Sequence, residues 1–325
     1  MIKLQDGIIS RLKIDPAGVA IALTVWFLPI ISVEFMWLQF FTPLPVFYYL
    51  MGSGRGRGIN TLAVALLITG LAATAFGATA AFFFLATLMP VGYILAANMA
   101  SKKGPVRAGL SAFVMLIISW TAWSLLYKIS NHASLYQDIV SSLDQVLIAT
   151  SKAVLDSSEL PAEHAMAFET AIGRLRDLVP RVMPGLLAIT MLNVVFLNMI
   201  TGQWLLRRSV RGQSYWAPFD EWRLPEQMVA IVIASGIFLL LPGGGLVNDI
   251  GLNLVMLAAI LYFFQGLAVI NGLLAVWNVS LWILFLALLF FQVYGIIFLA
   301  VLGLADVWVD FRKKAIGSDN NNFEK

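Results

Sequence analysis

Six polar side chains that lie in or beside long apolar runs are the residues most able to do chemistry in this chain. Five carry carboxamides, which both donate and accept hydrogen bonds, and one is a carboxylate. Polar groups inside an apolar span are costly and are therefore candidates for ligand binding. We expect them to line a polar pocket for a small solute, or else to hydrogen-bond neighbouring helices at about 0.6 kcal/mol each. They are Glu34, Asn193, Asn198, Asn253, Gln265 and Asn271.

The spacing of the carboxamides argues against one compact pocket on a single helix. Asn193 and Asn198 do not share a tight helical stripe. Asn253 and Asn271 would share one face of a straight helix, but they would lie roughly 27 Å apart along it. Gln265 lies off that face. A pocket built from these residues therefore needs several spans to bring them together.

Ionisable side chains near the apolar runs are few. Glu34 is either a solvated turn residue or, if the stretch 29–45 bends inside the bundle, a ligand for a cation or a substrate amine. Asp306 and Asp310 are four residues apart and Arg312 follows them. For these three we expect local salt bridges at the membrane surface.

Catalytic and metal-binding patterns are absent from the sequence. It contains no HExxH or GxSxG motif and no cysteine, and its two histidines are His132 and His164. The glycine-rich turn 52–58 lacks the pattern of a phosphate-binding loop. We therefore expect no catalytic residue, no metal, no cofactor and no enzymatic activity.

The composition is that of an integral membrane protein. Of 325 residues, 60% are hydrophobic and 12% are charged, against roughly 25% charged in a soluble domain. The net charge of +3 and the clustering of basic residues between apolar runs give no sign of a nucleic-acid partner. Because apolar residues are continuous in these runs and do not alternate with polar ones, we expect an all-α, polytopic transmembrane helix bundle of eight or nine spans. The apolar runs cover residues 17–33, 35–52, 60–77, 79–99, 107–128, 182–206, 227–243, 252–277 and 280–305.

Basic residues in the connections between the runs predict the orientation. If the N-terminus is cytoplasmic, the loops after the second, fourth and sixth spans are also cytoplasmic, and these are the loops that carry positive charge. This pattern predicts a multi-pass membrane protein with its N-terminus in the cytoplasm. The residues concerned are Lys3, Arg11, Lys13, Arg55, Arg57, Lys102, Lys103, Arg107, Arg207, Arg208 and Arg211.

The C-terminal third does not fit this scheme without an irregular segment. Three apolar runs separate the cluster at Arg207 from the basic residues that begin at Arg312, whereas an even number of crossings is needed to keep both on one side. A half-helix or re-entrant segment in 227–243 or in 252–277 would resolve the parity. Alternatively, the C-terminal tail lies outside.

The polar segment 129–181 separates the two apolar parts. Apolar residues recur in it at helical spacing, and Pro161 suits the first turn of a second helix. We therefore expect an extracytoplasmic helical hairpin that caps the bundle or docks a partner. The predicted organisation is a five-span membrane unit at 1–128, the hairpin at 129–181, a C-terminal membrane unit at 182–311 and a disordered tail at 312–325.

Three stretches resemble the YybS-like family of bacterial multi-pass membrane proteins, for which no activity is established. They are residues 42–45 with the turn 56–58, Asn253 with residues 265–270, and residues 302–312. This resemblance implies a bacterial cytoplasmic-membrane protein and supplies no catalytic residues. More weakly, the topology of 17–206 resembles the substrate-binding subunits of energy-coupling-factor transporters, and also rod-shape membrane proteins.

Two functions are consistent with these features. The first is a small-solute binding or transport component, favoured by the polar residues in apolar surroundings. The second is a structural membrane protein that organises a cell-envelope complex, favoured by the outer hairpin. Membrane lipids are the expected partners in both cases, and another membrane or envelope protein is a further candidate partner. The sequence does not indicate an oligomeric state.

Overall fold

The computed structural model describes residues 14–157, 161–209, 216–242, 244–277 and 279–313, and these residues form helices joined by short connections, with no strand among them. Six of the described helices are long and apolar enough to cross a membrane, and two apolar helices are shorter. The prediction of a polytopic helical bundle is therefore confirmed. The six long spans are Gly56–Ala75, Thr79–Ala100, Pro105–Asn131, Glu163–Ser209, Leu246–Val276 and Leu289–Val309.

The N-terminal unit contains one interrupted segment where the sequence predicted a single span at 35–52. Pro43 has no backbone N–H and its ring excludes a continuous helix, so a 3₁₀ helix ends before it and a new α-helix starts there. The elements are α2 (Pro16–Ile31), η1 (Val33–Phe41), α3 (Pro43–Gly52), α4 (Arg55–Ala75), α5 (Thr79–Ala100) and α6 (Pro105–Asn131).

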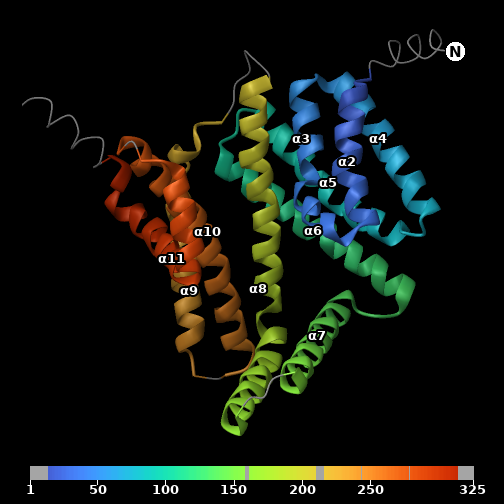
Figure 1. Cartoon of the computed structure of the whole chain (residues 1–325). Helices are drawn as coiled ribbons and strands as arrows, with labels where there is room; N and C mark the ends of the chain where they lie inside the picture. Colours follow the sequence, from blue (N-terminus) through green and yellow to red (C-terminus); the bar gives the residue numbers. More distant parts are fainter. Residues whose placement is uncertain (1–13, 158–160, 210–215, 243, 278, 314–325) are drawn as a thin grey trace, which may run out of the picture.

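The predicted hairpin at 129–181 is present and projects from one end of the bundle (Figure 1). It consists of α7 (Leu135–Ser157) and the first part of α8 (Ala162–Ser209). Arg176 on α8 donates to both carboxylate oxygens of Asp144 on α7, at 2.5 and 3.0 Å. Because α8 continues from the hairpin into the bundle, the predicted boundary at 181 falls within one helix.

The C-terminal unit packs beside α8. Its elements are η2 (Phe219–Glu221), η3 (Glu226–Met228), α9 (Val229–Leu240), α10 (Leu246–Val276) and α11 (Leu281–Val309). The described part of the connection before η2 is packed, since Trp216 and Trp222 are buried in the same core as Leu95, Leu116 and Leu206. This core therefore joins α5, α6 and α8 to the segment 216–224.

Several of the basic connections gather at the end of the bundle opposite the hairpin (Figure 1). The backbone N–H of Asp15 bonds the hydroxyl of Thr61 near the start of α4, at 3.0 Å. The indole N–H of Trp216 donates to the carbonyl of Lys103 between α5 and α6, also at 3.0 Å. Tyr48 on α3 donates to Ser209 at the end of α8. We refer to this end as the basic end.

An irregular segment of the C-terminal third lies in the last apolar run. At Gln292 the backbone of α11 has φ 37° and ψ −111°, which breaks the helix into two arms. Arg312, just after α11, lies beside Gly272 near the C-terminus of α10, since a Cβ atom added to Gly272 would be 3.5 Å from it. The C-terminus of α11 therefore returns to the side of the bundle where α10 finishes. Of the two places predicted for an irregular segment, 252–277 was wrong, because α10 is continuous there. The other, 227–243, forms α9, which has 12 residues and is shorter than the six long spans. The break in α11 is a further irregular place in this part of the chain.

The two helices α10 and α11 approach closely through glycines. A Cβ on Gly266 would lie 1.9 Å from the carbonyl oxygen of Leu299, and one on Gly303 would lie 2.0 Å from that of Tyr262. Real Cβ atoms essentially never come so near. Gly266 and Gly303 therefore form the packing contact between α10 and α11.

A buried ion pair fixes the end of α11 to the segment 216–224. Arg312 donates to Asp306 at 2.5 Å, and both side chains are almost fully buried. The same guanidinium donates to the backbone carbonyls of Asp220 and Trp222, at 2.5 and 3.0 Å. The expected salt bridge exists, but it is internal, and Arg312 is packed where the sequence placed the start of a tail. Residues 314–325 of that predicted tail lie outside the described residues.

We expect Gly266→Ala to destabilise the protein by about 1–3 kcal/mol, because the added methyl group meets backbone atoms that cannot rotate away. The matched control is Gly236→Ala on α9, where a Cβ meets nothing within 4 Å. Thermal unfolding in mild detergent measures both. Equal midpoints for the two variants would contradict the close approach of α10 and α11.

We expect Arg312→Met to lower the free energy of unfolding by about 3–5 kcal/mol, because it leaves Asp306 buried without a counter-charge. Adding Asp306→Leu to Arg312→Met should recover much of that loss, since no isolated charge then remains. The control is Arg223→Met, which removes an exposed pair with Asp310 and should change stability by about 1 kcal/mol or less. Similar losses in the two single variants would argue against a buried pair.

Candidate functional site

Three of the six predicted site residues lie apart from one another. Glu34 is exposed in η1 and accepts a hydrogen bond from the hydroxyl of Ser32. Asn193 is half-buried on α8 and donates to the carbonyl of Ile189 in its own helix, at 3.0 Å. Asn271 is half-buried near the end of α10. These three side chains do not share a cavity with the other predicted site residues.

Asn198 fastens the interrupted segment of the N-terminal unit. Its side chain is fully buried and donates to the carbonyl of Phe40 at the end of η1 and to that of Val194 in α8, both at 2.6 Å. The indole of Trp26 donates to the carbonyl of Thr42 at the same break, at 3.0 Å. Asn198 therefore holds backbone groups that a continuous helix would have satisfied itself.

Asn253 does the same for the proline-containing part of α8. Its carboxamide accepts from the N–H of Gly185 at 2.5 Å and donates to the carbonyl of Arg181 at 2.8 Å. In a regular helix these two backbone groups would bond each other. Pro184 leaves the carbonyl of Pro180 without its helical donor, and the hydroxyl of Tyr136 binds that carbonyl at 2.8 Å.

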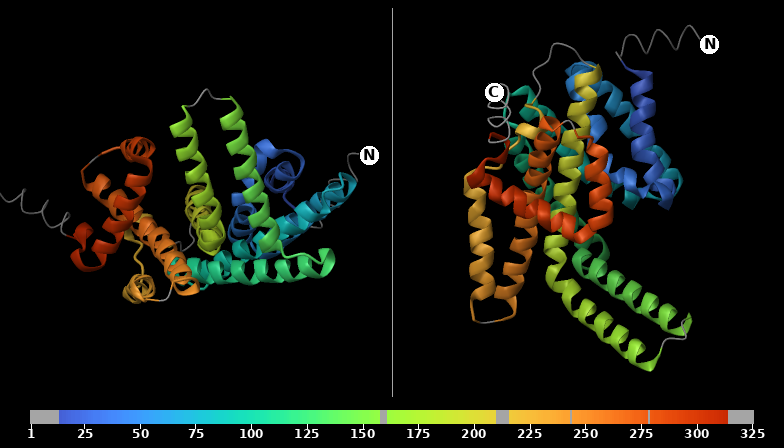
Figure 2. Two further views of the ribbon diagram at one scale, coloured as in Figure 1. Left: turned by 90° about the horizontal axis from the view of Figure 1, so that it is seen from below. Right: turned by 60° about the vertical axis from the view of Figure 1, so that its left-hand side comes forward.

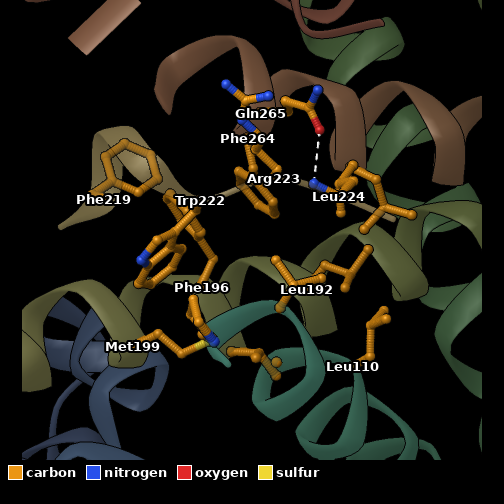
Figure 3. A pocket seen from close by; sticks show the side chains of 15 residues that line it. Leu110, Leu192, Phe196, Met199, Phe219, Trp222, Arg223, Leu224, Phe264 and Gln265 are labelled. Atoms are coloured by element: carbon orange, nitrogen blue, oxygen red, sulfur yellow. Dashed lines mark hydrogen bonds between the residues drawn. The ribbon is translucent and has the colours of Figure 1, made fainter. Parts of the chain in front are cut away.

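Gln265 lines a cavity. It is buried on α10, accepts from the N–H of Leu224 at 2.9 Å and donates to the carbonyl of Gly303 at 2.9 Å. The side chain thereby ties the segment 216–224 and α11 to α10. Figure 3 shows it at the edge of the cavity beside Phe264.

The cavity lies where α6, α8 and α10 meet the segment 219–224, and its volume is about 80 Å³. Its walls are almost entirely apolar, with aromatic rings from three elements pointing toward the space (Figure 3). No pattern in the sequence distinguishes these residues, because they are apolar positions distributed over four segments. The principal lining residues are Leu110, Leu192, Phe196, Phe219, Trp222 and Phe264.

A larger groove of about 840 Å³ adjoins the cavity. The two share Pro105, Val106, Leu110, Trp222 and Arg223, so they lie next to each other. The groove begins at Gly104, which caps the N-terminus of α6, and therefore lies at the basic end. Its rim carries polar and charged side chains, namely Arg107, Ser111, Glu221 and Arg223.

The charges at the rim have different environments. Arg223 forms a two-bond contact with Asp310, at 2.5 and 3.1 Å, and these hydrogen bonds lower the pKa of the Asp310 carboxyl below its ordinary value. Arg107 is exposed and has no ion-pair partner within the described part of the chain. It is therefore available to an anion beside the positive N-terminal end of α6.

Comparisons with known proteins identify the family. Among the described residues there is no group of three or more His, Asp or Glu side chains placed to hold a metal ion. No curated protein and no solved structure matches the chain. One family model, described as "Predicted membrane protein (DUF2232)", matches residues 18–307, which is most of the chain. The chain therefore belongs to this family of predicted membrane proteins.

Proposed function

We propose that this protein binds an amphipathic molecule with an apolar tail and an anionic head. The observation that carries the proposal is that the apolar cavity shares five lining residues with the groove that Arg107 borders. The proposal refines the expectation of a small-solute binding component. The proposed pocket is apolar and is not lined by the predicted set of carboxamides, because most of those side chains form hydrogen bonds with backbone groups.

The apolar part of the ligand is the part that the cavity favours. Each methylene removed from water contributes about 0.8 kcal/mol. The aromatic rings of Phe196, Phe219 and Phe264 supply flat walls for a chain or ring system. Gln265 faces the cavity with both ends of its carboxamide already bonded, which removes a polar competitor from the wall.

The head of the ligand is matched by the rim. The N–H groups in the first turn of a helix lack internal partners and attract anions, and α6 begins in the groove. Arg107 adds a full charge in that first turn. Because Glu221 lies across the groove, the arrangement favours a singly charged head or one that also carries an amine.

Orientation and location follow from the basic end. We propose that this end faces the cytoplasm of a bacterial cell, with the N-terminus inside, according to the positive-inside rule. The resemblances to the YybS-like family and to energy-coupling-factor substrate-binding subunits agree with a cytoplasmic-membrane binding component. Any use of ATP in transport would need a separate protein, because the sequence contains no nucleotide-binding motif.

A second candidate function is the organisation of an envelope complex by the hairpin. It is favoured by apolar side chains that α7 and α8 leave exposed, among them Val146 and Met166. In that case deletion of 135–178 should abolish co-purification of a partner while the membrane domain stays folded. Partner binding that survives the deletion would contradict this function.

We expect native mass spectrometry of the protein in mild detergent to show a bound molecule of lipid-like mass. Leu110→Trp should lower its occupancy roughly tenfold, because Leu110 lies where the cavity meets the groove. Arg107→Gln should lower it about fivefold through the loss of one charge near the membrane surface.

The matched controls are Leu125→Trp, at an exposed position on the same helix, and Arg174→Gln, an exposed charge on the hairpin. Neither should change occupancy. Undiminished binding in folded Leu110→Trp protein would refute the proposed site. A chain that carries no ligand but arrives with a second protein would favour the envelope function.

A further inference from the structure

The first arm of α11 is too short to cross a hydrocarbon layer. The first arm runs from Leu281 to the break at Gln292, which is about 16 Å at helical rise. That length is roughly half of a 30 Å hydrocarbon layer. Figure 2 (right) shows the two arms as separate helices that meet at an angle. α11 thus enters from the basic end, turns inside the layer and returns.

A helix break at this depth exposes backbone groups that lipid cannot satisfy. Each helix end leaves N–H or C=O groups without internal partners. In hydrocarbon each such group costs several kcal/mol, so irregular backbone is tolerated only where protein covers it or water reaches it. Two other irregular places in the bundle follow this rule, with Asn198 bonded to the carbonyl at the end of η1 and Asn253 bonded to the backbone of α8.

Gln292 is placed like those two residues but has nothing to bond. Its side chain is exposed, and it makes no hydrogen bond with any residue that the structure describes. Its neighbours Phe290 and Tyr294 are each 80% exposed. A primary amide surrounded by exposed aromatic side chains at the break indicates a surface that protein, rather than lipid, covers.

Water is a poor alternative for this surface. A cavity of about 460 Å³ lies between α10 and the two arms of α11. Its lining is apolar apart from the hydroxyl of Tyr294, and no charged side chain contributes to it. Such walls do not offer the two to four polar partners that an ordered water needs.

We propose that the α11 turn is covered by the same turn of a second copy of this chain, with the two Gln292 side chains adjacent across a twofold axis. In a twofold dimer the same patch contacts itself, so the patch must be self-complementary. A carboxamide satisfies this condition because it donates and accepts, and two such groups can pair reciprocally. The absence of charge on the described side chains around the turn removes the usual cause of repulsion between identical patches.

Cysteine cross-linking tests the dimer, and the natural chain contains no cysteine that would interfere. Gln292→Cys and Phe290→Cys should form covalent dimers when native membranes are oxidised. The control Leu71→Cys, at an exposed apolar position on α4, should stay monomeric. Products formed between Gln292→Cys and a different polypeptide would overturn the proposal of a second copy.

A second measurement separates pairing of the amides from mere proximity. In the Phe290→Cys background, Gln292→Leu should reduce the dimer yield roughly three- to tenfold, as expected for two lost interhelical hydrogen bonds, while Gln292→Asn should retain more of it. Native mass spectrometry should show dimers of the unmodified chain. A monomeric mass together with no cross-link at 290 or 292 in folded protein would overturn the proposal. Ligand occupancy at the groove is independent of these variants.

Discussion

The fold depends on one constraint, which is that backbone hydrogen-bonding groups must find partners in a medium without water. Regular helices meet it unaided, but this chain departs from regularity at η1–α3, at the proline pair of α8 and at Gln292. At the first two places a carboxamide from another helix supplies the missing partner. The polar residues of the apolar runs are thus mainly the means by which irregular helices remain stable in the membrane.

The same logic explains how the candidate site is closed. The segment 216–224 is not helical throughout, and its backbone is satisfied from three directions, by Gln265, by Arg312 and by Gln203. Fixing this segment places Phe219 and Trp222 against α8 and α6, so that an apolar cavity remains beneath a charged rim. A stable loop and a binding site therefore come from one set of contacts.

Sequence patterns predicted the helices, the hairpin and the clustering of basic residues, and they singled out Asn198, Asn253 and Gln265 as unusual. They did not predict what these side chains bind. Their long-range partners are backbone groups 68 or more residues away for Asn253 and 158 residues away for Asn198, and no local pattern carries that information. The residues that line the cavity could not be predicted for a related reason. An apolar residue in an apolar run looks like any other in the sequence until its neighbours in the fold are known.

By itself, therefore, the sequence determined the class of the protein, because length and hydropathy decide whether a helix can span a membrane. It also determined which connections share a side, because charge is costly to move across lipid. Only the tertiary structure decided that 35–52 is broken at Pro43, that α10 is continuous and that α11 turns back at Gln292. Each outcome depends on whether another helix offers a partner to exposed backbone, or a glycine offers room, and both are properties of packing.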